Sequence, residues 1–181
     1  MIKSAILEEQ KAQLQKEELA ARILAQSRNE LYLKLRYLDL ALGNLALFPG
    51  TTSPAGTDGG VLYYFPDGLL SLYEQRGRAA CTRLYLHVIL HCLFCHPFDR
   101  KGRDGRLWSL ACDVTAEALI DSLCLKCVHI SSGAFRKSVY ARLREKLPVL
   151  TAEGIYRWIT EMLSEVEVSR WEMEFRLDDH S

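Results

Sequence analysis

The sequence predicts a mainly α-helical domain of the α+β class, with a short β-hairpin or small sheet. Apolar residues recur at helical spacing over most of the 181 residues, whereas one short run, residues 61–65, has β character. A loop rich in glycine, proline, serine and threonine, residues 48–60, separates that run from the first helical stretch. The chain is long enough to enclose a hydrophobic core, so we expect a folded domain.

The composition argues against two classes of partner. Lysine plus arginine (23 residues) equals aspartate plus glutamate (23 residues), so no net charge attracts nucleic acid or an anionic membrane. No apolar run reaches the roughly 18 residues that span a bilayer. The N-terminus, residues 1–9, becomes acidic too early for a secretory signal. We therefore expect a cytoplasmic protein with no nucleic-acid or membrane partner.

The first predicted element is a helix over residues 3–42, because leucine and isoleucine form an apolar stripe along it. The polar residues 27–29 predict a break in this helix. We therefore expect an N-terminal helical extension over residues 1–29 and a domain over residues 30–181. The chain stops at residues 178–181 with no sign of a natural terminus, so we expect that a C-terminal partner domain is absent.

Further helices are predicted after the β-type run, with a polar turn over residues 99–106. Their expected ranges are 67–77, 79–95, 107–123, 133–146 and a helix for which Thr151 is the N-cap. Pro97 disfavours helical geometry at His96, so the central helix should stop there. The tail, residues 166–177, alternates partly between polar and apolar residues and is expected to be extended.

The central helix carries two histidines, His87 and His91, inside an apolar run. Residues four apart on a helix differ by about 40° around its axis, so both imidazoles point the same way. This spacing is the frame of the zinc-protease motif H-E-x-x-H, in which two histidines bind the metal. The glutamate position of the motif holds Val88 instead. Two buried histidines bonded to ordinary acceptors are the alternative interpretation.

Three further residues could complete a metal site: His96, Asp113 and Glu117. His96 lies on a different helical face from His91 and could reach a metal only if the chain turned back before Pro97, so we weight it below Asp113. Asp113 and Glu117 are four residues apart on the next predicted helix, and a carboxylate from a neighbouring helix can complete a zinc site. They could equally be a pair at the surface or at a helix end.

The six cysteines offer a rival site. Two C-x-x-C pairs, Cys92 with Cys95 and Cys124 with Cys127, could hold zinc, although such ligands usually lie in loops. We expect free thiols in a reducing compartment, packed as small hydrophobic residues.

Several segments in order resemble the metallopeptidase-type domain found N-terminal to a von Willebrand factor A-like domain in bacterial proteins. The segments are Thr57-Asp58-Gly59, Leu62-Tyr63-Tyr64, Leu86 to Cys92, His96, Trp108 to Asp113, and Asp178-Asp179-His180. The resemblance implies a zincin-like fold with zinc as the cofactor and with the His-x-x-x-His helix beside a small sheet. It implies that Asp113 approaches the metal, and that the strand at Leu62, Tyr63 and Tyr64 borders a cleft where an extended peptide could bind.

The departure at Val88 predicts a degenerate peptidase. In zincins, the motif glutamate takes a proton from the attacking water and passes it to the leaving amine, and valine can do neither. General acid–base catalysis contributes about 10²–10⁴-fold, so we expect activity to be lost or very weak. Glu117 or Asp113 could replace the base, which would give an active metal-dependent hydrolase.

A third interpretation is a protein-interaction module, which would dock a von Willebrand A-like domain in cis or an AAA+ partner. The basic residues of the predicted helix 133–146 are better explained as a solvated face than as a nucleic-acid site, because the overall charge is neutral. These residues are Arg136, Lys137, Arg142, Arg144 and Lys146.

Overall fold

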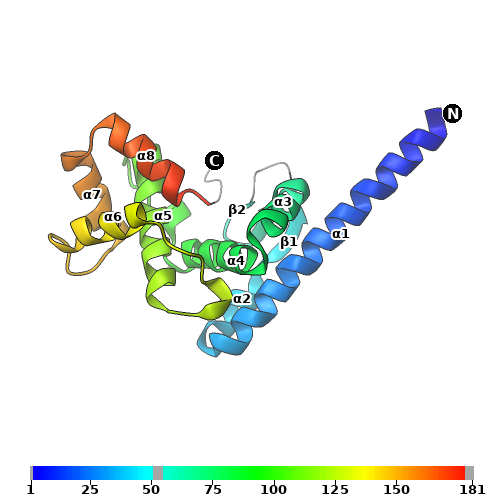
Figure 1. Cartoon of the computed structure of the whole chain (residues 1–181), viewed down its shortest axis with the longest axis horizontal. Helices are drawn as coiled ribbons and strands as arrows, with labels where there is room; N and C mark the ends of the chain where they lie inside the picture. The colour runs from blue at the N-terminus through cyan, green and yellow to red at the C-terminus, as the bar shows by residue number, and fades with distance from the viewer. Residues whose placement is uncertain (1, 51–54, 178–181) are drawn as a thin grey trace.

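The computed structural model describes residues 2–50 and 55–177. These residues form eight α-helices, a three-stranded sheet and short 3₁₀ turns (Figure 1). The helices are α1 (Ile2–Lys34), α2 (Asp39–Asn44), α3 (Pro66–Arg76), α4 (Arg78–Leu93), α5 (Gly105–Ser122), α6 (Ala134–Arg144), α7 (Ala152–Met162) and α8 (Glu165–Phe175). The strands are β1 (Ala46–Pro49), β2 (Ala55–Thr57) and β3 (Val61–Tyr64). A mainly α fold with a small sheet is therefore confirmed.

The described residues form two large apolar clusters, and a third, small one contains Trp108, Cys112 and Ala152. Figure 1 shows α6, α7 and α8 gathered at one end and α1 extending away at the other. The first cluster unites the second half of α1 with α2, the sheet, α3 and α4, and the second unites α5 with α6, α7 and α8. Helix α5 contributes Ala116 and Ile120 to the first cluster and Val114 and Ala118 to the second. It therefore joins the two cores.

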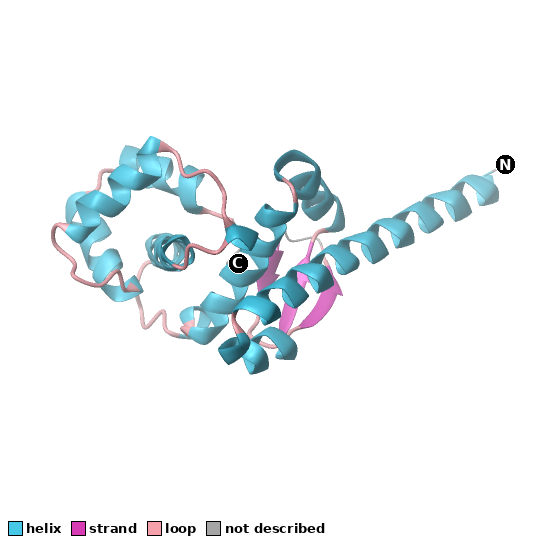
Figure 2. Cartoon of the chain, turned by 60° about the horizontal axis from the view of Figure 1, so that its bottom comes forward, coloured by secondary structure: helices cyan, strands magenta, loops and turns pink. Residues whose placement is uncertain are grey.

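The sheet lies beside α1 and α4 (Figure 2). Its strand order is β1-β3-β2, with β1 parallel to β3 and β2 antiparallel to β3. β3 is therefore the central strand, and both of its edges are used for pairing. The predicted loop over residues 48–60 is wrong in part, because it contains the end of β1 and all of β2, while residues 51–54 lie outside the described part of the chain.

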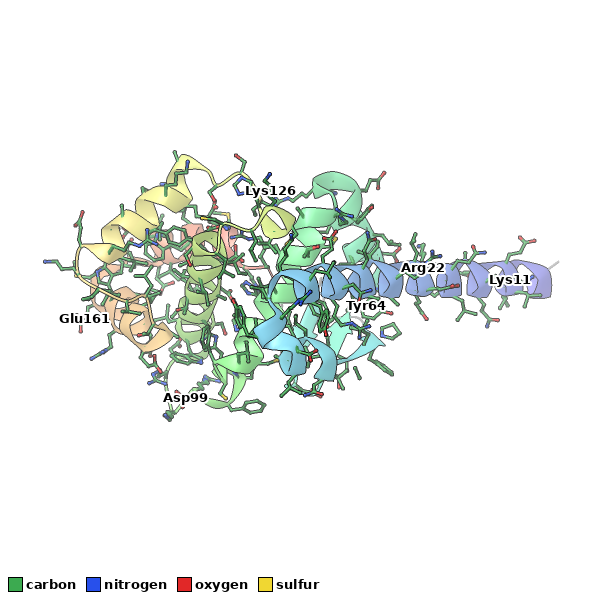
Figure 3. All side chains as sticks on the ribbon, turned by 90° about the horizontal axis from the view of Figure 1, so that it is seen from below. Lys11, Arg22, Tyr64, Asp99, Lys126 and Glu161 are labelled. Atoms are coloured by element: carbon green, nitrogen blue, oxygen red, sulfur yellow. The ribbon has the colours of Figure 1, made fainter. Side chains whose placement is uncertain are left out.

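The predicted break at residues 27–29 is wrong, because α1 continues to Lys34. Ser27 is fully buried there, and the Thr82 hydroxyl on α4 donates a hydrogen bond to it at 3.3 Å. Residues 6–16 of the same helix are exposed, and Figure 3 shows Lys11 on the part of α1 that protrudes. Leu24 and Leu31 pack in the core on either side of residues 27–29, so the helix crosses the proposed domain boundary without interruption.

The tail was expected to be extended, and it is instead helix α8. Ser164 caps this helix: its side chain accepts from the Glu167 backbone N–H, and the Glu167 side chain accepts from the Ser164 N–H. Val168, Trp171 and Phe175 follow at spacings of three and four and are buried in the second cluster. The capping-box spacing was present in the sequence and outweighs the partial alternation.

Two predicted helix limits are confirmed. α4 ends at Leu93, just before Pro97, and the Thr151 side chain accepts a hydrogen bond from the Gly154 N–H at the start of α7. None of the described helices is both long and apolar enough to cross a membrane.

Candidate metal centre

Helix α4 places its two histidines in the interior of the molecule. His87 and His91 are 0% and 1% exposed, because α1, α3 and α5 pack around α4. Buried polar side chains require partners, so the atoms that face them decide what this site can do.

Three donor atoms converge between α4 and α5. The Nε2 atoms of His87 and His91 are 2.9 Å apart, and Asp113 Oδ1 lies 3.4 Å from each of them. Among the described residues, these three form the group of histidine, cysteine and carboxylate side chains that could hold a metal ion. The alternative that Asp113 is a carboxylate at the surface or at a helix end is therefore wrong, because α5 directs it inward and leaves it 2% exposed.

Glu117 lies one turn further along α5, behind His87. Its Oε1 is 3.0 Å from His87 Nδ1, and its Oε2 accepts from Arg83 at 2.6 and 2.8 Å and from Arg136 at 2.5 Å. Burial alone would raise the pKa of Glu117, but the hydrogen bond and charge of His87 and the charge of Arg83 hold that pKa at about 2. Glu117 is therefore an ionised acceptor, and His87 Nδ1 must carry the hydrogen.

The position of the hydrogen on His87 Nδ1 decides which ring nitrogen of His87 is available to a metal. The low pKa of Glu117 corresponds to a protonated His87; if a metal ion displaces the Nε2 proton, the ring keeps its Nδ1 hydrogen and presents the Nε2 lone pair toward His91 and Asp113. The site thus brings together two imidazole nitrogens and one carboxylate oxygen, all from buried side chains. This donor set suits a divalent cation. The carboxylate behind a ligating histidine is also the usual outer partner in such sites. The residues present therefore fit the metal ion that the spacing of the H-E-x-x-H motif implies.

His96 reaches the site by a turn at Cys95 that no glycine marks in the sequence. Cys95 adopts a left-handed conformation (φ 56°) although it is not glycine, and this turns the chain back toward α4. His96 Nδ1 then lies 3.0 Å from His91 Nδ1, on the side of that ring away from Asp113. The Trp108 indole N–H donates to the His96 carbonyl at 3.1 Å and fixes the turn. His96 is thus placed behind His91 and outside the converging trio.

A cavity of about 670 Å³ opens on one side of the trio. Its lining includes His91, His96 and Asp113, together with Thr57 and Asp58 from the end of β2. Backbone hydrogen bonds from Gly60 and Val61, with the Tyr63 hydroxyl, hold the pKa of Asp58 below its ordinary value.

The sheet residues at this cavity differ from those expected. The predicted cleft strand, Leu62, Tyr63 and Tyr64, is the central strand β3 and does not line the cavity. β2 is the strand at the cavity, and the Thr57 hydroxyl at its end lies 3.6 Å from Cys92 Sγ on α4. The edge strand was missed because β2 lies within a stretch whose composition predicted a loop.

Val88 is fully buried and belongs to the first apolar cluster, which also contains Leu84 and Leu62. The cavity lining does not include it. The position that the H-E-x-x-H motif gives to the base therefore belongs to the core in this chain.

The rival cysteine site receives no support in the described residues, because the candidate ligand group contains no cysteine. Cys81 and Cys112 are buried, as expected for cysteines that pack as small hydrophobic residues, whereas Cys95 and Cys124 are exposed, so that expectation is wrong for these two.

Two site residues were missed from the sequence. Arg83 precedes His87 by four residues, so it shares the face of α4 that carries both histidines, and this spacing could have identified it. Arg136 was assigned to a solvated basic face, and this is wrong, because α6 buries it against Glu117. No signal in the sequence indicates that pairing, since the two residues lie on different helices.

Comparison with known families agrees with this geometry. The model of a family described as a putative metallopeptidase domain matches residues 33–180, which is most of the chain. No curated protein and no solved structure matches the chain. The matched region contains the trio, Glu117 and the residues that line the cavity; the segment Asp178 to His180 lies outside the described residues.

Proposed function

Because the chain belongs to the family of putative metallopeptidase domains, we propose that it is a metal-binding, zincin-like domain whose peptidase activity is lost or very weak. His87, His91 and Asp113 are the proposed ligands, and zinc is the proposed metal. The observation that carries this proposal is the convergence of their three donor atoms, within 4.8 Å of one another, at a buried site that opens onto a cavity.

The charges around the site support a divalent cation. Arg83 and Arg136 meet the charge of Glu117, whereas Asp113 Oδ1 lies against the Nε2 atoms of both histidines. A carboxylate oxygen beside two imidazole nitrogens offers a negatively charged ligand to a dication.

The residues at this site have three proposed roles: to bind the metal, to orient its ligands and to contact a bound peptide. A bound zinc ion would act as a Lewis acid toward a carbonyl or a water molecule. His87, His91 and Asp113 would hold it, Glu117 would orient His87, and His96 would orient His91. Thr57 and Asp58, at the end of β2, are the proposed sheet residues beside a bound peptide, in place of the central strand β3.

Weak activity is expected because the residues considered as the base are poorly suited to that role. A general base works best with a pKa near the working pH, whereas the pKa of Glu117 is lowered and both of its oxygens are engaged. Asp113 is assigned to the metal, and Val88 cannot exchange a proton. A replacement base is therefore the weaker alternative.

Metal analysis of the purified protein tests the proposal. We expect about one divalent ion per chain, lost in His87→Ala and kept in His129→Ala, because His129 is exposed and lies away from the trio. The analysis should cover iron as well as zinc, since two imidazoles and a carboxylate suit both metals. The same preparation should leave unfolded casein intact; chelator-sensitive cleavage that His87→Ala abolishes would refute the loss of activity.

A folded protein without metal would instead favour the interaction module. In that case the domain would serve to dock a von Willebrand A-like domain or an AAA+ partner, and its buried histidines would be structural. Co-purification of this chain with a separately expressed von Willebrand A-like domain would support this alternative, and independent migration of the two would argue against it.

A further inference from the structure

Arg136 on α6 is a buried charged residue that is not one of the proposed metal ligands. Its side chain is 4% exposed and makes charged contacts in two directions. One guanidinium nitrogen, Nη1, donates to Glu117 Oε2 at 2.5 Å. The others donate to Glu174 Oε1 at 2.8 Å and to the Glu174 backbone carbonyl at 2.7 Å. Arg136 therefore bridges α5 and the C-terminal end of α8.

The Glu117 side of this bridge leads directly to His87. Oε2 of Glu117 accepts hydrogen bonds from both arginines, Arg83 on α4 and Arg136 on α6, and Oε1 accepts one from His87 Nδ1. A carboxylate held from both sides cannot rotate without breaking charge-assisted hydrogen bonds, which are stronger than neutral ones. The orientation of Glu117 is thus fixed, and with it the ring plane of His87 and the nitrogen that carries its hydrogen.

The α8 side of the bridge leads to the cavity. The Arg136 guanidinium lies 4.9 Å from the centre of the Phe175 ring, which is fully buried in the second cluster. The next residue, Arg176, lines the cavity beside His91 and Asp113, as does Glu172 one turn earlier. The end of α8 is therefore held by the same side chain that holds Glu117.

From this geometry we infer that Arg136 is a positioning residue for the metal site, and that it makes metal binding and the docking of α6 and α8 interdependent. The inference rests on the proposed function, because it requires a metal at His87, His91 and Asp113. If fixing Glu117 strengthens metal binding, the bound metal must by thermodynamic linkage strengthen the docking of α6 and α8 by the same factor.

Arg136→Lys is the test variant, because it keeps the charge but loses the planar fork that contacts Glu117 and Glu174 together. Two variants of the same helix are matched controls. Arg142→Lys changes an exposed arginine that pairs with Glu167, and Val139→Ala removes buried volume from the second cluster while Arg136 and Glu117 are both kept. Val139→Ala therefore separates lost stability from lost positioning.

The measurements are Zn²⁺ affinity by competition with a chromophoric chelator, and the visible absorption spectrum of the Co²⁺-loaded protein. We expect Arg136→Lys to weaken Zn²⁺ binding about 10-fold and to alter the Co²⁺ spectrum, because Arg136 acts through Glu117 and about 10-fold is the lower end of the range for an outer partner of a ligand. Both controls should bind within about 2-fold of the unchanged protein and keep its spectrum, although Val139→Ala unfolds at lower urea.

Hydrogen exchange with and without Zn²⁺ tests the linkage. Zn²⁺ should increase protection in α6 and at the end of α8 in the unchanged protein, and this gain should be smaller in Arg136→Lys. If Arg136→Lys binds Zn²⁺ with unchanged affinity and spectrum, the inference is overturned while the metal site stands. If the unchanged protein binds no Zn²⁺, Co²⁺ or Fe²⁺, both the proposed function and this inference fail.

Discussion

Buried polar side chains between α4 and α5 form a layer that runs from Arg83 and Glu117 to His91 and Asp113. The two ends of this polar layer have different surroundings. At the closed end, Glu117 is 0% exposed and its charge is met by Arg83 and Arg136 inside the protein. At the open end, His91 and Asp113 border a cavity of about 670 Å³. His87 lies between the two ends, with one ring nitrogen directed to each.

The difference separates what maintains the fold from what is available to a ligand. A buried ion pair is strongly destabilising when one partner is removed, because the other charge is left without compensation. A carboxylate beside a cavity can be neutralised at much lower cost. We therefore expect changes at the closed end to reduce stability, and changes at the open end to reduce metal binding while the fold is kept.

Removing Glu117 should have the largest effect on stability. Glu117→Ala leaves two buried guanidinium groups without their shared carboxylate, which should lower the free energy of unfolding by about 3–5 kcal/mol. Urea unfolding followed by circular dichroism measures this. Asp67→Ala is the control, because Asp67 is half exposed and pairs with Lys16 at the surface, where the expected loss is below about 1 kcal/mol. Equal losses in the two variants would contradict the distinction between the ends.

Restoring the motif glutamate should also destabilise the protein. Val88→Glu places a carboxylate among apolar side chains in the first cluster, at a cost on the order of 3 kcal/mol, and it should not restore casein cleavage. Val88→Met is a control for size, and should cost less than about 2 kcal/mol. A stable Val88→Glu protein that cleaves casein would show that position 88 can face the cavity.

Asp113→Asn examines the open end. This variant keeps the shape of the side chain and removes the charge of a carboxylate that borders the cavity, so the metal-free protein should unfold within about 1 kcal/mol of the unchanged protein. Zn²⁺ affinity should fall by at least about 100-fold, which exceeds the upper range for an outer partner. Calorimetric titration and urea unfolding of the same sample give both quantities. A large loss of stability without metal would place Asp113 with Glu117 as a structural group.

The smallest effect is expected outside the layer, at the exposed cap of α8. Hydrogen bonds from the Ser164 backbone, Arg142 and the Ser164 hydroxyl lower the pKa of Glu167 to about 2. A carboxyl group whose pKa is lower in the folded state stabilises the protein above its unfolded pKa of about 4.3, and this contribution is lost as the pH falls toward 2. Glu167→Gln should therefore lower Tm slightly at pH 7, and the difference should disappear near pH 2. A difference that is independent of pH would mean that the charge of Glu167 contributes nothing.

The parts of the fold that could be predicted were those with strong local signals. The central helix and its end before Pro97, the Thr151 cap and the mainly helical class all follow from residues near one another in the chain. α8 was missed although the Ser164–Glu167 capping box was present, because the partial alternation of its residues was given more weight. β2 was missed because a three-residue strand is held by its pairing with β3 and not by its own composition.

The sequence by itself determined which residues share one face of α4. The helical period brings Arg83, His87 and His91 onto one side, and Val88, one residue later, is directed away from it. The converging donor pair and the lack of a motif base at position 88 follow from this local geometry alone.

Only the tertiary structure decided what meets that face. The crossing of α5 over α4 brings Asp113 to the histidines and Glu117 behind them, the left-handed turn at Cys95 brings His96 back, and α6 supplies Arg136. The physical reason is that backbone periodicity fixes directions around one helix, whereas distances between helices depend on how their apolar faces pack.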